Sequence, residues 1–75
     1  MTRELDRVVL TKPMVVLGLE VGDIGTVVMV HGGGRGFEVE FVTLDGQTHA
    51  VTTVLADDVR PIHRNEIAHA RVLAA

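Results

Sequence analysis

Turn-forming residues interrupt this chain at short intervals, and their spacing limits what it can fold into more than any other feature. Apolar residues alternate with a period of two in segments that are broken about every 8 to 12 residues. The interruptions include Lys12-Pro13, "GGGRG" at residues 32–36 and "LDGQ" at residues 44–47. This rhythm is typical of a small all-β barrel or sandwich, so the sequence predicts strands and not helices over most of its length.

Five strands are predicted from this pattern. They cover residues 6–11, 24–31, 37–43, 48–55 and 59–62. Asp45-Gly46 is a strong hairpin signal, because both central residues of a type I′ turn need positive φ, so strands two to four are expected to form an antiparallel meander. Residues 55–62, "LADDVRPI", indicate one helical turn followed by an edge strand, since Pro61 has no N–H to donate.

The predicted core takes one face of each strand. Strand three gives the clearest assignment, because its apolar residues alternate with Glu38 and Glu40. Strands one and four allow a second register that differs by one residue. The predicted core residues are Val8, Leu10, Ile24, Val28, Val30, Phe37, Val39, Phe41, Val51, Leu55 and Val59.

Strand two is apolar on both faces, so its outer face needs a cover. That face is predicted to carry Val27, Met29 and His31. Residues 63–75 change to helix-forming types, with Asn65 suited to the N-cap and Arg71 to the C-terminal end, so a short C-terminal helix is predicted. We expect this tail either to lie on an apolar surface or to fray, because an isolated helix of this length is marginal.

The composition points to an apolar surface beyond what one small core hides. The chain has 75 residues, of which 47% are apolar, and it contains two Phe and no Trp or Tyr, so the surplus is aliphatic. Such a surface favours self-association over the stacking of sugars or bases. The candidate interaction surface consists of Val27, Met29, His31, Ile67, Val72 and Leu73.

Several classes of function are disfavoured by the residues present. The chain has no cysteine and no serine, and a filled small barrel leaves no room for a substrate pocket, so catalysis is not expected. His31, His49, His63 and His69 lack the spacing of a zinc site. We therefore expect neither a metal nor another cofactor.

No export signal is expected in the N-terminal segment. Glu4 and Asp6 interrupt the apolar stretch that a signal peptide needs, and no segment approaches the roughly 20 apolar residues of a membrane span. A cytoplasmic location is therefore expected.

Two glycine-rich segments invite a binding interpretation. "GDIGTVV" at residues 22–28 is similar to the KOW-type entry into barrels of ribosomal and transcription proteins, but its neighbours Glu20 and Asp23 are acidic and the net charge is −3. We expect these glycines to serve a tight turn and a bulge. In "GGGRG", Arg35 is a candidate anion contact, but a strand and not a helix follows, which favours a hairpin tip.

Four blocks carry a resemblance to a known family. "ELDRVVLT", "GLEVGDIGTVVMV", "GFEVEFVTLDGQT" and "LADDVRPI" occur in this order within residues 4–62, and the chain resembles the small bacterial family called domain of unknown function 4926. The resemblance implies an SH3-like barrel and no assigned activity. The full prediction is an all-β, five-stranded SH3-like barrel over residues 1–62 with a helical tail over residues 63–75.

The function expected from these observations is that of a non-catalytic interaction module. It self-associates, as a dimer, or binds a protein partner through its apolar surface. The alternative is a KOW-type module that binds nucleic acid. The charge of the chain and the salt dependence of binding distinguish the two functions, because nucleic-acid affinity requires basic side chains and falls steeply with salt.

Overall fold

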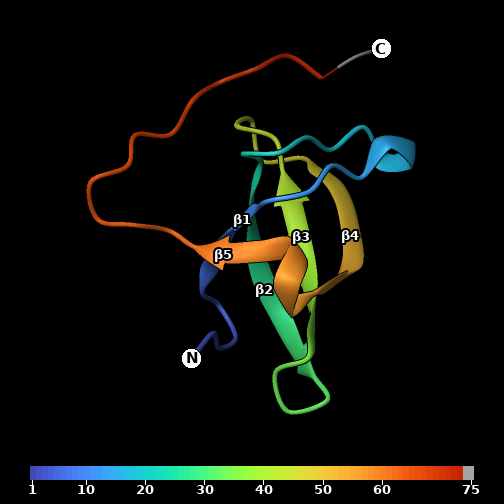
Figure 1. The fold of residues 1–75 in the computed structure, drawn as a ribbon. Helices are drawn as coiled ribbons and strands as arrows, with labels where there is room; N and C mark the ends of the chain where they lie inside the picture. Colours follow the sequence, from blue (N-terminus) through green and yellow to red (C-terminus); the bar gives the residue numbers. More distant parts are fainter. Residues whose placement is uncertain (74–75) are drawn as a thin grey trace.

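The strands form one antiparallel sheet in the order β4-β3-β2-β1-β5 (Figure 1). The computed structural model describes residues 1–73, so the last two residues of the predicted helical tail lie outside the described part. The elements are β1 (Arg7–Leu10), η1 (Val15–Leu17), β2 (Ile24–His31), β3 (Gly36–Val42), β4 (Thr48–Leu55), η2 (Ala56–Asp58) and β5 (Val59–Pro61). The five predicted strands and the helical turn before the last strand are confirmed, with ends that differ by at most one residue.

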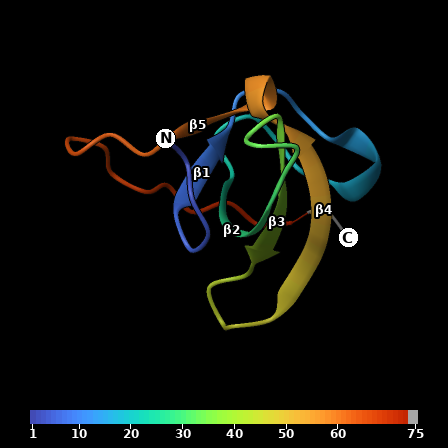
Figure 2. The ribbon, with the colours of Figure 1, turned by 90° about the horizontal axis from the view of Figure 1, so that it is seen from below.

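The sheet bends so that its two ends face each other. β2, β3 and β4 form the predicted meander, and β5 crosses them at a steep angle (Figures 1 and 2). The core lies between the two parts of the bent sheet. Within residues 1–73, no helix is long and apolar enough to cross a membrane.

The predicted closed barrel is wrong for the described residues, which form an open sheet. β5 has three residues and pairs with β1, whereas the outer edge of β4 pairs with no strand among residues 1–73. Closure would require β5 to reach β4 as well. A three-residue strand that ends in Pro61 is too short and lacks the final N–H donor for this.

The core confirms part of the predicted set and corrects the rest. Val8, Leu10, Phe37, Val39, Phe41 and Val59 are buried as predicted. Val30 is partly buried against this cluster. The predictions for Val51 and Leu55 are wrong, because both are exposed and Val54 is the buried residue of β4. Val9 and Leu19 are buried without having been predicted.

In β2 the predicted faces are wrong for Val27 and Val28, whereas Met29 is exposed and Val30 partly buried as predicted. Val27 was predicted on the surface and is fully buried, whereas Val28 was predicted in the core and is 40% exposed. Ile24 is only half-buried. The physical reason is a β-bulge between Val27 and Met29, which shifts the register against β3 and changes the parity of the strand.

The two glycines of "GDIG" have different structural roles. Gly22 has a φ of 97° in the turn before β2, a conformation that favours glycine. Gly25 lies in β2, where a Cβ atom would come within 2.9 Å of Phe41 Cε1 and 3.1 Å of the Glu40 carbonyl oxygen. Gly22 therefore serves the turn that the sequence predicted. The predicted bulge is not at these glycines but between Val27 and Met29, and Gly25 instead lets β2 approach β3 closely.

The predicted C-terminal helix is absent from the described residues. Residues 62–73 contain one turn and otherwise run without regular secondary structure, back across the end of the sheet (Figure 1). Arg60 fixes the bend, because its guanidinium donates two hydrogen bonds to the Glu66 carboxylate at 2.8 and 2.6 Å. A helix this short is marginal on its own. In the structure the side-chain contacts between Arg60 and Glu66, and not a helix, hold this part of the tail in place.

Candidate interaction surfaces

The loop before β2 holds a carboxylate at the end of the sheet. Asp23 Oδ2 accepts a hydrogen bond from the backbone N–H of Glu20 at 2.9 Å, and the Asp23 carbonyl accepts one from the N–H of Leu10, also at 2.9 Å. The Gly22 N–H donates to the Leu10 carbonyl. The loop is thus tied to the end of β1, and the Asp23 side chain has a fixed direction.

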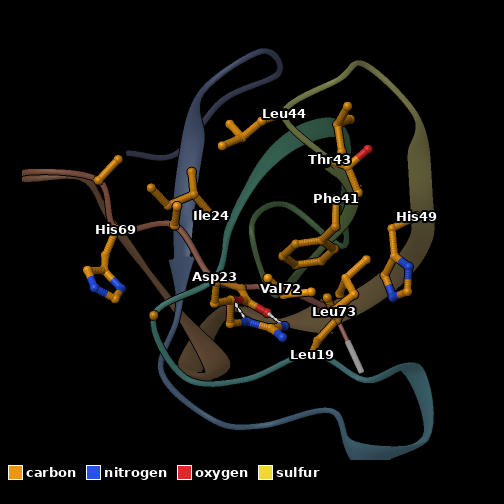
Figure 3. A pocket seen from close by; sticks show the side chains of 15 residues that line it. Leu19, Asp23, Ile24, Phe41, Thr43, Leu44, His49, His69, Val72 and Leu73 are labelled. Atoms are coloured by element: carbon orange, nitrogen blue, oxygen red, sulfur yellow. Dashed lines mark hydrogen bonds and ion pairs between the residues drawn. The ribbon is translucent and has the colours of Figure 1, made fainter. Parts of the chain in front are cut away.

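Arg71 from the tail meets this carboxylate. Its Nε donates to Asp23 Oδ1 at 2.8 Å and its Nη2 to Asp23 Oδ2 at 2.5 Å (Figure 3). The same Nη2 donates to the Gly18 carbonyl at 2.9 Å, and Nη1 lies 3.4 Å from a Glu20 carboxylate oxygen. The planar guanidinium therefore has a bidentate acceptor and a third, backbone acceptor.

This contact also changes the protonation of Asp23. The hydrogen bonds from Arg71 hold the pKa of the Asp23 carboxyl below its ordinary value, although partial burial acts in the opposite direction. The carboxylate is therefore charged at neutral pH. The loop offers a fixed negative charge to a cation at this end of the sheet.

A cleft of about 480 Å³ lies between the tail and the sheet next to this ion pair. Its apolar floor includes Leu19 from the loop before β2, Ile24 of β2 and Phe41 of β3, and its tail side is formed by residues 68–73 (Figure 3). Leu73 comes close to this apolar floor and is partly buried. The cleft combines an apolar surface with one charged group, a combination typical of binding sites.

The outer edge of β4 is a second candidate surface. Within residues 1–73 the backbone of this strand pairs with β3 alone, although β4 has eight residues and is the longest strand together with β2. Its sequence, "THAVTTVL", contains no Asp, Glu, Lys, Arg, Pro or Gly. An uncharged edge of this length is a template for pairing with another strand.

The residues predicted for an interaction surface on β2 separate in the structure. Val27 is buried in the core and is not a surface residue. Met29 is 51% exposed on the outer face opposite Glu38, and His31 is half-buried with Nε2 at 3.0 Å from a Glu38 carboxylate oxygen. Of these three residues, Met29 alone presents an apolar side chain to solvent.

The predicted tail residues do not cover β2 in the way expected. Ile67 and Val72 are almost fully exposed, and the cleft is lined by both Val72 and Leu73. The tail crosses near the start of β2, at the opposite end from the "GGGRG" hairpin (Figure 1). Sequence reasoning missed Asp23 as the partner of Arg71, because the two residues are 48 positions apart and Arg71 was assigned to a helix end.

The histidines and Arg35 occupy separate positions. His49 Nε2 donates to the Leu17 carbonyl at 2.6 Å, and His63 lies 3.8 Å from the Glu66 carboxylate. Within residues 1–73, no group of three His, Asp or Glu side chains is arranged to hold a metal ion. Arg35 is exposed at the tip of the β2–β3 hairpin, where its N–H donates to the His31 carbonyl.

The fold and these surfaces define a small β-sheet protein with a bent, open antiparallel sheet and a docked C-terminal tail. Residues 4–61 match the family described as domain of unknown function (DUF4926), and the chain belongs to this family. A search of curated protein sequences and of solved structures found no significant match.

Proposed function

We propose that this protein is a non-catalytic interaction module that self-associates through the outer edge of β4. In this arrangement β4 pairs with β4 of a second copy, and the two sheets join into one continuous sheet. The observation that carries the proposal is the outer edge of Thr48–Leu55, eight residues without Asp, Glu, Lys or Arg that pair with no further strand among residues 1–73. Backbone donors and acceptors along such an edge find partners in an identical antiparallel strand.

Charge favours this pairing. β4 brings no Asp, Glu, Lys or Arg to the contact, and the exposed Val51 and Leu55 lie beside it. The acidic residues of β3, Glu38 and Glu40, would face their copies across three strand spacings, or about 14 Å. This separation exceeds the screening length of about 8 Å at physiological salt, so their mutual repulsion is weak.

The proposed assembly stops at a dimer. Antiparallel pairing of two identical edges has two-fold symmetry and leaves neither copy of β4 with an unpaired edge. The opposite end of the sheet is β5, which has three residues and ends in Pro61, so it is a poor template for further strands. A closed dimer is therefore favoured over a growing filament.

The decisive experiment compares two lysine substitutions in sedimentation equilibrium at about 10 to 100 μM protein. Val51→Lys places a charge on the edge strand, and Met29→Lys places the same charge on β2, away from the edge. The two residues are matched, because Val51 is 52% and Met29 51% exposed. We expect the wild type and Met29→Lys to sediment as dimers and Val51→Lys as a monomer.

Other outcomes contradict the proposal in different ways. A monomeric wild type over this concentration range would rule out self-association. Loss of the dimer in Met29→Lys alone would show that the interface lies on the outer face of β2 and not at the edge of β4. Circular dichroism of all three proteins confirms that a change in mass does not come from unfolding.

A further inference from the structure

We infer that the cleft at the end of the sheet is a binding site for an extended peptide segment of another protein that carries an arginine followed, two positions later, by a large apolar residue. This site lies at the end of the sheet beside β4, whose His49 is one of its lining residues, and the groups proposed to recognise the peptide are Asp23, Leu19, Ile24 and Phe41 together with the carbonyl of Gly18. The C-terminal tail of the chain itself acts as a weak built-in occupant.

The arginine requirement follows from the acceptors. Asp23 presents both carboxylate oxygens to one guanidinium, and the Gly18 carbonyl accepts a third hydrogen bond from the same group. The Glu20 N–H holds the carboxylate in this direction. A lysine ammonium lacks the planar fork that reaches two carboxylate oxygens in parallel, so the geometry selects arginine.

The spacing of the apolar residue follows from the extended tail. Successive side chains of an extended segment point to opposite sides, so Arg71 and Leu73 share the side that faces the sheet while Val72 is exposed. Leu73 reaches the apolar floor beside Leu19 and Phe41 (Figure 3). An external peptide meets the same floor at the same spacing.

The tail itself fits the cleft poorly. A space of about 480 Å³ remains between the tail and the sheet, and residues 61–70 are all exposed. Two positions before Arg71 the tail presents His69, although the lining of the cleft includes the apolar side chains of Ile24 and Leu44 (Figure 3). A peptide with a large apolar residue at this position fills more of the cleft, so it is expected to displace the tail.

The test uses the full chain and three synthetic peptides that carry a fluorophore at the N-terminus. The first has the tail sequence of residues 66–75, the second carries His69→Leu, and the third carries both His69→Leu and Arg71→Ala. Fluorescence anisotropy is measured with the wild-type chain and with the Arg71→Ala chain, whose own tail competes less. We expect the second peptide to bind the Arg71→Ala chain about tenfold more tightly than the wild type, because the apparent affinity rises with the fraction of open cleft.

Matched variants identify the site. The third peptide should bind at least about tenfold more weakly than the second, because Asp23 then lacks its guanidinium partner. Asp23→Asn in the Arg71→Ala background should weaken the second peptide to a similar extent, and its amide oxygen still accepts the Glu20 N–H. Arg64→Ala removes an exposed arginine of the same tail and should leave binding at the wild-type level.

Three outcomes would overturn this inference. Equal binding of the second and third peptides would show that arginine is not recognised, and equal binding to the wild-type and Arg71→Ala chains would show that the tail does not occupy the site. A fall in oligomeric state with Arg71→Ala would show that the cleft holds the tail of a second copy and not a partner peptide. Because the peptide is tested with variants of Asp23 and Arg71 and the edge pairing with Val51→Lys, failure of this inference is distinguishable from failure of the proposed edge pairing.

Discussion

Arg71 and Asp23 lie 48 positions apart in the sequence and are joined side chain to side chain by two hydrogen bonds, at 2.8 and 2.5 Å. The contact fastens a tail without regular secondary structure to the loop that leads into β2. Since residues 61–70 are exposed, this ion pair is the main attachment of the last part of the described chain. Its removal should change the motion of the tail more than the stability of the sheet.

The first prediction concerns that motion. Arg71→Ala should release residues 67–73, so that their ¹H–¹⁵N heteronuclear NOE values fall while those of the five strands stay unchanged. Arg64→Ala is the matched control, because it removes an exposed arginine of the same segment. Unchanged NOE values in Arg71→Ala would mean that the apolar contacts of Leu73 hold the tail without the ion pair.

The second prediction concerns the bend between β5 and the tail. The two hydrogen bonds from Arg60 lower the pKa of Glu66 to about 2 from its ordinary value of 4.5. A lowered pKa in the folded state means that the stabilisation is present above pH 4.5 and is lost as the pH falls toward 2. Titration of the Glu66 side-chain carboxyl resonance should give this low pKa, and Arg60→Gln should raise it toward the ordinary value. A wild-type pKa near 4.5 would show that the bend is not formed in solution.

The third prediction tests which face of β2 is buried. Val27→Ala should lower the free energy of unfolding by about 2 to 3 kcal/mol, because it removes two methyl groups from a filled core. Val28→Ala is the control on the next residue, which is 40% exposed, and should cost less than about 1 kcal/mol. Urea denaturation measures both. If Val28→Ala lowered the free energy of unfolding more than Val27→Ala, the result would support a regular alternation of buried and exposed residues in β2 without a bulge.

The fourth prediction separates the two glycines of "GDIG". Gly25→Ala should destabilise the fold by about 1 to 3 kcal/mol, because its Cβ would collide with Val39, Phe41 and the Glu40 carbonyl inside the sheet. Gly22→Ala meets no atom within 4 Å and carries only the strain of a φ of 97°, so a loss of about 1 kcal/mol is expected. Thermal or urea unfolding compares the two. A harmless Gly25→Ala would contradict the close approach of β2 and β3.

The fifth prediction addresses nucleic acid. The net charge is −3, and Glu20 and Asp23 flank the turn that a KOW-type barrel uses for RNA. We therefore expect no saturable binding of mixed-sequence RNA or DNA at up to about 100 μM protein and physiological salt. Fluorescence anisotropy measures this directly. Micromolar binding that weakens steeply between low and moderate salt would support the nucleic-acid alternative.

The sequence by itself determined the strands. Pro13, the "GGGRG" segment and Asp45-Gly46 mark turns through local backbone constraints that hold in any tertiary context, and the positions of the strands followed from them. Strand three was also assigned to the correct face. Its glutamates oppose burial strongly, so Phe37, Val39 and Phe41 had one possible direction.

Only the tertiary structure decided the faces of β2 and β4. Both strands carry apolar or neutral residues on each side, so hydrophobicity does not distinguish the two registers. In β2 the buried face is determined by the bulge at Val28. In β4 it is determined by the pairing of Phe37 with Val54. A bulge depends on the partner strand and leaves no composition signal in a run of valines.

The candidate sites depended on long-range contacts even more. Within residues 1–73 the outer edge of β4 is unpaired because the sheet does not close, and strand order is a property of the whole fold. The cleft follows from one arginine that reaches a carboxylate 48 residues away. Periodicity and turn signals report on neighbours in sequence, so they fixed the elements of this protein, whereas the packing of distant segments set its edges and its cleft.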